Sequence, residues 1–533
     1  MAGFKSGLVV SANPIASRSG LRILKKGGNA VDAAVTTAHT LGVAAPAFSG
    51  IGGGGFALIW LAREAKAIFV DYRERAPLGA MEDMFRITAS GRVSRDENSV
   101  GYKAVAVPTA LAGHASILEK YGTMRLENTL EPAIRYARRG FRVGRALAYT
   151  WKLSTNKLKR FKDSRSTYLR NGRAYRLGQE IKLPQLAKTL AAIASKGVSE
   201  FYSGTISKKI LGDMTLNGGL LAPADFERYA PTIREPVRGL YKGYEVISAP
   251  PPSSGGTIIL QALNMLENYD LSGNGPASTS ALHILAEALA RSYISCRTRI
   301  SDPDFSEPIG ELLSKDFARE LAATIDPNAS SVPAEATSSP LMSASNTSHL
   351  VTVDSEHNVV SLTESVECYF GSGVTVPGTG VILNDTMHDF EPKPHMVNSV
   401  APWKIPMSCM SPTIVLKEGR PIMALGSAGG PRIPSSTLQV FLNAIEFEMG
   451  LEDAVSAPRI HVHGNLVQVE NTMNREAVSG LRKMGHKVEV KRLVDKENPG
   501  LYFGGVHAAQ LLQDNSLIGA PDPRRDGSAL AYS

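Results

Sequence analysis

Thr347 lies at a point where the residue pattern of the sequence changes. The stretch SASNTSHLVTVD, residues 343–354, passes there from small polar residues to an alternating apolar run. A threonine hydroxyl is a poor nucleophile without a base beside it. Its own α-amino group becomes that base if the bond after Asn346 is cut, because an α-amine titrates at about pH 8. The change of pattern at Thr347 therefore indicates a self-cleaving threonine enzyme, although an ordinary threonine at the start of a strand has the same local pattern.

Histidine and cysteine positions give a weaker signal. His461 and His463 have the spacing that places two rings on one face of a strand, but no nearby carboxylate or cysteine completes a ligand set. Cys296, Cys368 and Cys409 are odd in number and have no C-x-x-C spacing. We therefore expect neither a metal site nor a disulfide framework, and we expect no cofactor.

A β-hairpin is the element that must position Thr347. Residues 349–354 and 359–366 alternate as strands around a polar turn at 355–358. Before them, residues 327–346 are rich in Ser, Ala and Pro, which predicts an exposed flexible segment. A flexible segment that ends at a buried strand suits self-cleavage, since the tail can leave while the new N-terminus stays in a sheet.

A glycine cluster near the N-terminus needs a separate interpretation. Gly50, Gly52 and Gly55 satisfy G-x-G-x-x-G, the dinucleotide-binding fingerprint. That fingerprint requires a strand before it and a helix after it. Here a helix that Asn29 can cap comes before it, and the apolar run FALIWLA follows as a strand. We therefore predict a tight loop with close backbone approach and no nucleotide site.

Composition indicates a folded globular protein. The 533 residues are 43% hydrophobic, and 49 Gly with 31 Pro favour an α/β or α+β class over an all-helical one. The net charge is only +8, and the basic run 151–176 is interpreted as a solvated helical face in preference to a nucleic-acid site. No run of eighteen uncharged apolar residues occurs. We expect no membrane span and a cytoplasmic location, or a periplasmic or secreted one if an export signal has been removed.

Several motifs in register resemble the γ-glutamyltransferase (γ-glutamyltranspeptidase) family of N-terminal-nucleophile hydrolases. In chain order, these motifs are ILKKGGNAVDAAV, GGGGF, DYRERAP, PPPSSGG, NTSH, FGSGVTVPGTGVILNDTMHDF, MSCMSPTIV, LGSAGGPRI and DPRRDGSALAY. The resemblance covers nearly the whole chain. It implies an α+β fold, specifically a four-layer αββα sandwich with two mostly antiparallel sheets between helix layers.

The resemblance also implies catalytic roles. Cleavage between Asn346 and Thr347 would give a large chain, 1–346, and a small chain, 347–533, which together form one fold as a heterodimer, with further oligomerisation left open. Thr347 would be the nucleophile of the mature enzyme. Ser365 matches a family hydroxyl, usually threonine, that bonds to the nucleophile. Gly429 and Gly430 match the backbone N–H donors of an oxyanion hole.

The resemblance also implies which residues bind the substrate. Arg73 matches the arginine that holds the α-carboxylate of a γ-glutamyl group, Ser408 a serine that also holds it, and Asp389 the acid that binds the α-ammonium. Three positions depart from the family. Cys409 replaces a serine, Glu367 replaces an asparagine, and Thr386 replaces a Gln or Glu.

The expected reaction is acyl transfer through a γ-glutamyl ester on Thr347, from a small γ-glutamyl donor such as glutathione to water, an amino acid or a peptide. A relative with another amide substrate is the alternative: a cephalosporin-type acylase, an oxamate-type amidohydrolase or a polyglutamate capsule enzyme. An uncleaved, non-catalytic binding protein with the same fold is the alternative from a different class.

Overall fold

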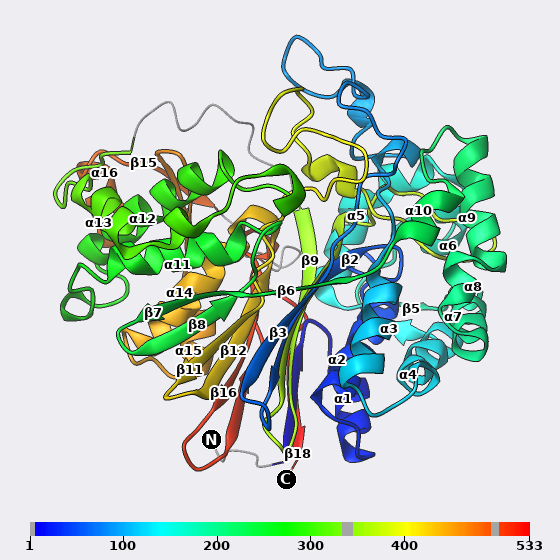
Figure 1. Ribbon diagram of the computed structural model, residues 1–533, viewed down its shortest axis with the longest axis horizontal. Helices are drawn as coiled ribbons and strands as arrows, with labels where there is room; N and C mark the ends of the chain where they lie inside the picture. Colours follow the sequence, from blue (N-terminus) through cyan, green and yellow to red (C-terminus); the bar gives the residue numbers. More distant parts are fainter. Residues whose placement is uncertain (1–5, 333–344, 492–499, 533) are drawn as a thin grey trace.

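The computed structural model describes residues 6–332, 345–491 and 500–532 (Figure 1). Most of the segment that was predicted to be flexible, 327–346, lies outside the described residues. Two large antiparallel sheets stand side by side in the centre of the molecule, and helices cover the outer face of each (Figure 1). Among the described helices, none is long and apolar enough to cross a membrane.

The first sheet has seven strands in the order β18-β1-β9-β10-β2-β3-β6, and every neighbouring pair is antiparallel. Its strands are β18 (Ser528–Tyr532), β1 (Gly7–Ser11), β9 (Ser345–Val353), β10 (Val359–Cys368), β2 (Gly54–Leu61), β3 (Lys66–Tyr72) and β6 (Thr232–Arg234). The predicted hairpin around 355–358 is therefore confirmed as β9 and β10, and it lies in the middle of this sheet.

The second sheet has six strands in the order β17-β16-β12-β11-β8-β7, also antiparallel throughout. Its strands are β17 (Leu517–Ala520), β16 (Gly505–Leu511), β12 (Arg420–Ala428), β11 (Thr413–Lys417), β8 (Tyr244–Ser248) and β7 (Val237–Tyr241). β9 and β10 of the first sheet pack against β12 of the second, so Thr347 lies close to the plane where the two sheets meet.

Helices α1–α10 lie on the side of the first sheet and α11–α16 on the side of the second (Figure 1). The first group is α1 (Pro14–Lys25), α2 (Ala30–Ala44), α3 (Ala110–Tyr121), α4 (Leu126–Arg139), α5 (Arg145–Lys159), α6 (Lys162–Tyr168), α7 (Pro184–Lys196), α8 (Ser199–Tyr202), α9 (Thr205–Leu216) and α10 (Pro223–Arg228). The second group is α11 (Gly255–Leu266), α12 (Thr279–Arg297), α13 (Lys315–Ala323), α14 (Ile433–Ile445), α15 (Leu451–Ser456) and α16 (Arg475–Lys483). Two small sheets add β4 (Phe141–Arg142) with β5 (Glu180–Ile181), and β13 (Ile460–His463), β14 (Leu466–Glu470) and β15 (Lys487–Lys491).

Three hydrophobic cores hold these four layers together. Phe56, Leu58, Val351 and Ile414 belong to the core between the two sheets. A second core joins the first sheet to its helices, and a third joins the second sheet to α11, α12 and α14. Alternate strand residues therefore point into different cores, which is why both faces of the central strands are apolar. The αββα sandwich predicted from the resemblance is confirmed.

Two local predictions are also confirmed. Asn29 caps α2 in a capping box, since its side chain accepts from the backbone of Val31 and Asp32 while Asp32 accepts from Asn29. The glycine loop after α2 leads into β2 and allows close contact. A Cβ at Gly52 would lie 2.0 Å from the carbonyl oxygen of Ile382. The order helix, loop, strand excludes the dinucleotide interpretation.

The basic run 151–176 forms α5, α6 and the following loop. Trp151 and Tyr168 are buried among other aromatic rings, whereas Lys159, Lys162 and Arg165 are exposed. The aromatic residues that could have stacked with bases are therefore core residues, and the charges form a solvated helical face as predicted.

Candidate active site

A β-bulge surrounds Thr347. In the ladder between β9 and β10, Ser348 pairs with Glu364 and Asn346 pairs with Glu367, and the register shifts in between. Thr347 therefore opposes two residues, Ser365 and Val366, where a regular ladder would have one. Bulges of this kind re-aim side chains and are frequent beside active sites. Thr347 and Asn346 are only 3% and 2% exposed.

The peptide bond between Asn346 and Thr347 is held from both ends. The Ser365 hydroxyl donates a hydrogen bond to the Asn346 carbonyl oxygen. The backbone N–H of Glu367 donates to Ser365 Oγ at 2.8 Å, which fixes the direction of that hydroxyl. The Thr347 N–H donates to Asn346 Oδ1 at 3.2 Å. A hydroxyl donor on a carbonyl oxygen increases the positive character of its carbon, so this contact would favour a nucleophile that attacks there.

The glycine pair lies beside the strand that carries this bond. Gly429 and Gly430 directly follow β12 and have φ of +143° and +57°, values that favour glycine. A Cβ at Gly429 would lie 2.7 Å from the Cα of Gly504. The short 3-10 helix Gly430–Arg432 packs against β9, which brings the predicted oxyanion donors beside the strand of the predicted nucleophile.

Arg73 anchors a buried, acid-rich cluster, which we call the acyl pocket after the role that the family resemblance predicts for Arg73, Glu367 and Asp389. It directly follows β3 and is 1% exposed. Its guanidinium lies 3.3 Å from Glu74, 3.6 Å from Glu367 and within bonding distance of Asp389. The structure therefore brings the predicted Arg73, Glu367 and Asp389 together. They come from the residue after β3, from β10 and from the 3-10 helix Thr386–Asp389.

The acyl pocket contains more acid than its one arginine balances. Burial raises the pKa of Glu74 to about 7. Burial, followed by the neighbouring charge of Glu367, raises the pKa of Asp389 well above its usual range. Among the described residues, Glu367 Oε1 and Arg73 Nε are buried without a hydrogen-bond partner. A cationic group entering this pocket would find an unsatisfied carboxylate oxygen.

Thr386 and Cys409 also belong to the acyl pocket. Thr386 Oγ1 donates to Glu74 Oε1 at 2.9 Å. Burial raises the pKa of the Cys409 thiol to about 12, and the charges of Asp389 and Glu367 add to that effect. Cys409 is therefore a neutral group near both carboxylates.

Ser408 is placed differently. Its Oγ accepts a hydrogen bond from the Met410 N–H at 3.1 Å, and its carbonyl accepts one from Ser254 N–H at 2.8 Å. Within the described part of the chain, no hydrogen bond joins Ser408 to Arg73. The structure thus gives Ser408 a backbone role at the turn before β11.

Two acidic residues of this region were missed by the sequence analysis. Glu74 follows Arg73 in DYRERAP and pairs with it. Asp385 accepts from the Cys368 N–H at 2.9 Å, and burial raises the pKa of its carboxyl. The sequence signal that could have identified Glu74 was its position next to Arg73. For Asp385 the sequence offered no signal beyond its place in the NDTMHDF motif.

Metal-ligating side chains gather elsewhere. His461, one of the two strand histidines, forms a hydrogen bond between its Nδ1 and the Ser435 hydroxyl at 3.0 Å. This side chain therefore has a structural contact. Within the described ranges, the one group whose ligand atoms all lie within 4.8 Å of one another is His283, Glu287 and His486. Glu287 already pairs with Arg291 at 2.6 Å. None of these residues belongs to the predicted site.

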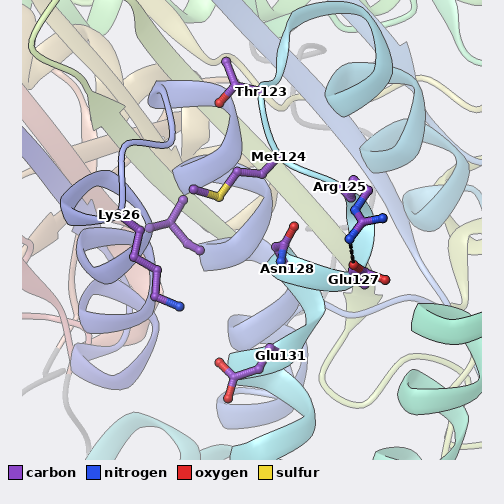
Figure 2. Close-up of a pocket in the computed structure, with 8 residues that line it drawn as sticks. Lys26, Thr123, Met124, Arg125, Glu127, Asn128 and Glu131 are labelled. Atoms are coloured by element: carbon purple, nitrogen blue, oxygen red, sulfur yellow. Dashed lines mark ion pairs between the residues drawn. The ribbon is translucent and has the colours of Figure 1, made fainter.

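A surface cavity of about 740 Å³ lies between the C-terminal end of α1 and the start of α4 (Figure 2). Its lining residues are Ile23, Lys26, Thr123, Met124, Arg125, Glu127, Asn128 and Glu131. Arg125 pairs with the exposed Glu127, and the acidic and basic side chains nearly balance. No residue of the predicted active site lines this cavity.

Comparison with known proteins gives matches along nearly the whole chain. The family model "Gamma-glutamyltranspeptidase" matches residues 16–532. A "glutathione hydrolase proenzyme" from a Pseudomonas species is 36% identical over 99% of this chain and 95% of its own length. An "acylase ACY 1 proenzyme" from another Pseudomonas strain is 38% identical over 99% of this chain and 94% of its own length. The crystal structure of a cephalosporin acylase from Bacillus halodurans superposes with a TM-score of 0.90 at 30% identity, covering 100% of this chain and 97% of that one.

Proposed function

Because this chain belongs to the gamma-glutamyltranspeptidase family, we propose that it is a self-processing enzyme that transfers or hydrolyses γ-glutamyl groups. Thr347 is its nucleophile, and the acyl pocket around Arg73 holds the γ-glutamyl head. Cleavage after Asn346 converts the precursor into a heterodimer of chains 1–346 and 347–533. The names of its relatives, glutathione hydrolase and acylase, agree on acyl chemistry at an amide and differ in the substrate.

Processing is supported by the contacts on the bond to be cut. Thr347 Oγ1 attacks the carbonyl carbon of Asn346, and its proton passes to the Thr347 nitrogen as the C–N bond breaks. Ser365 stabilises the charge that develops on the carbonyl oxygen, because its hydroxyl already donates to that atom. Water then hydrolyses the resulting ester, which leaves an Asn346 carboxylate and a free Thr347 amine.

Turnover repeats this chemistry on a substrate amide. The freed Thr347 amine accepts the proton of its own hydroxyl, whose oxygen attacks the γ-carbonyl carbon. The N–H groups of Gly429 and Gly430 face the developing oxyanion, and the substrate amine leaves with the proton. Water or a second amine then resolves the γ-glutamyl ester. A resident metal or cofactor has no step in this scheme.

The charge balance of the acyl pocket is the observation that carries the γ-glutamyl assignment. Glu74, Glu367 and Asp389 surround one guanidinium, and one oxygen of Glu367 has no described partner. A γ-glutamyl group brings an α-ammonium together with its α-carboxylate, so it adds the missing cation. A glutaryl group brings only a carboxylate and would meet like charges.

An acylase acting on another side chain is the second candidate. Three pocket residues, Glu367, Thr386 and Cys409, depart from the γ-glutamyltransferase pattern. The acylase names among the relatives and the match to a cephalosporin acylase also favour it. This candidate keeps Thr347, Ser365 and the glycine pair in the same roles and changes only what the acyl pocket holds.

Two measurements test the proposal. Intact mass after expression should give two fragments that begin at residues 1 and 347 for the wild type, and one uncleaved chain for Thr347→Ala. A single full-length wild-type chain would favour the uncleaved binding protein.

The processed protein is then assayed with γ-glutamyl-4-nitroanilide, glutaryl-7-aminocephalosporanic acid and oxamate. We expect turnover of the first, and selective turnover of the second or third would reject the γ-glutamyl assignment.

A further inference from the structure

The bulge opposite Thr347 is held by residues that lie outside the β9–β10 ladder. Val366 lies within the register shift, and both of its backbone groups bond elsewhere. Its N–H donates to the Phe48 carbonyl oxygen at 3.2 Å, and its carbonyl oxygen accepts from the Asp385 N–H at 3.2 Å. Buried backbone groups must be paired. The bulge therefore depends on two loops, one before β2 and one before the 3-10 helix Thr386–Asp389.

Asp385 bonds to this bulge twice. Besides its backbone bond to Val366, its Oδ1 accepts a hydrogen bond from the Cys368 N–H at 2.9 Å. Val366 and Cys368 are the two neighbours of Glu367, so one residue holds the backbone on both sides of Glu367. Asp385 is fully buried, which means that solvent does not compete for either bond.

Glu367 has a backbone conformation that needs such support. Its φ is +76°, in the left-handed region, which asparagine adopts more readily than glutamate. Conformations of this kind persist only where the surrounding structure holds them, and they cluster at functional sites. Glu367 replaces an asparagine of the family pattern, so this chain has at that position a residue with less tolerance for the conformation it adopts.

The left-handed conformation of Glu367 directs two groups. Its N–H donates to Ser365 Oγ at 2.8 Å, and its carboxylate lies 3.6 Å from Arg73. Ser365 in turn donates to the carbonyl oxygen of Asn346. Rotation of the Glu367 backbone would turn its N–H away from Ser365, and the Ser365 hydroxyl would lose the contact that fixes its direction.

The position of Asp385 is itself set by the residue before it. The Asn384 side chain donates to the carbonyl oxygens of Gly52 at 2.8 Å and Ala106 at 3.0 Å. Its Oδ1 accepts from the N–H groups of Ala106 at 3.0 Å and Thr386 at 3.1 Å. Both donors and the acceptor of this amide are therefore used, and they fix the Asp385 loop against the glycine loop.

We propose that Asp385 is a positioning residue for self-processing. It maintains the left-handed backbone of Glu367, and this backbone directs the Ser365 hydroxyl at the carbonyl of the bond to be cut. Asp385 acts through these two residues and not on the reacting atoms. The inference rests on the proposed self-processing and adds a residue that the family resemblance did not supply.

Variants of Asp385 give the first test. The chain is made by cell-free synthesis, and electrophoresis over time follows the loss of the full-length band. Asp385→Ala loses the acceptor for the Cys368 N–H, so we expect processing to slow by about 10- to 100-fold. Asp385→Asn keeps a side-chain oxygen that accepts, and it should process at least about 10-fold faster than Asp385→Ala. Equal rates for the wild type and Asp385→Ala, or for the two variants, would overturn the proposal.

A rescue separates positioning from general stability. Because asparagine tolerates the left-handed region, Glu367→Asn added to Asp385→Ala should recover at least about half of the lost rate on a logarithmic scale. Glu367→Val should process at least about 10-fold more slowly than Glu367→Gln, because a β-branched residue strongly disfavours positive φ. This second comparison remains informative if Asp385→Ala does not fold. No recovery in the double variant, or equal rates for the valine and glutamine variants, would overturn the proposal.

Asp225→Ala is the matched control. Asp225 is also a buried aspartate, and its carboxylate accepts from the N–H groups of Leu78 and Ala222 at 2.7 Å each, at the start of α10. We expect this variant to process at the wild-type rate, and equal slowing in Asp225→Ala and Asp385→Ala would overturn the positioning role. Absence of processing in the wild type would instead reject the proposed function itself.

Discussion

Arg73 and Arg525 are both buried guanidinium groups, yet their surroundings are opposite. Arg73 contacts Glu74, Glu367 and Asp389, whereas Arg525 has no carboxylate partner among the described residues. The difference teaches that equal burial does not imply equal pairing: one guanidinium is surrounded by carboxylates, and the other contacts a backbone carbonyl oxygen and an aromatic ring.

Stability provides the largest test of this contrast. In the uncleaved Thr347→Ala background, Arg73→Met leaves three buried carboxylates without their cation, and we expect it to cost about 3–5 kcal/mol of unfolding free energy. Arg525→Met removes a buried charge that has no described counterion, so we expect a loss under about 1 kcal/mol or a gain. Urea denaturation at pH 7, followed by circular dichroism, measures both. Equal losses would contradict the contrast.

Processing gives the next test, because hydrogen bonds of the described residues connect the backbone of Glu367, on the Arg73 side, with the bond that we propose is cut. Glu367 donates from its backbone to Ser365, which in turn donates to the Asn346 carbonyl. We expect Ser365→Ala to slow processing by about 10²- to 10³-fold, the usual effect of losing one oxyanion donor. Ser365→Thr keeps the hydroxyl and is the control. Electrophoresis over time follows the disappearance of the full-length chain, and an unchanged rate in the alanine variant would be inconsistent with this role.

The pH dependence gives the smallest predicted effect. The charge of Glu367 helps raise the pKa of Asp389, so Glu367→Asn should lower that pKa. Asp389 must be ionised to bind an ammonium. The rising limb of kcat/KM for γ-glutamyl-4-nitroanilide should therefore move to lower pH, by on the order of one pH unit. Arg63→Gln is the control, because Arg63 is exposed and pairs with Glu356 away from this cluster, and its limb should stay in place. A shift of the Glu367→Asn limb to higher pH would rule out this coupling.

The secondary structure around Thr347 was predictable from local signals. The alternation of residues 349–354 and 359–366 with a polar turn is a strong hairpin pattern, and the structure has this hairpin, with its first strand beginning at Ser345, two residues before Thr347. The capping residue Asn29 and the helix before the glycine loop were equally local. The αββα arrangement came from the family resemblance, since strand order in a sheet depends on contacts that are distant in sequence.

Features that depend on distant contacts were missed. The stretch SLTESV in β10 reads as a regular strand, so the bulge opposite Thr347 could not be predicted. Glu74 and Thr386 are 312 positions apart, and only the folded chain brings their side chains together. Arg524 and Arg525 are adjacent and identical in type, yet one is fully paired and the other is not. Sequence alone does not separate them.

The order of strands in the seven-stranded sheet has a consequence for the life of the processed protein. β18, β10 and all of β9 from Thr347 onward lie after the proposed cleavage point, and they are interleaved with β1 and β2 from before it. Removing one covalent link therefore leaves two polypeptides whose backbones remain hydrogen-bonded to each other along several ladders. Cleavage would therefore be irreversible, but the two chains would stay associated. Neither product could diffuse away unless the whole sandwich unfolded.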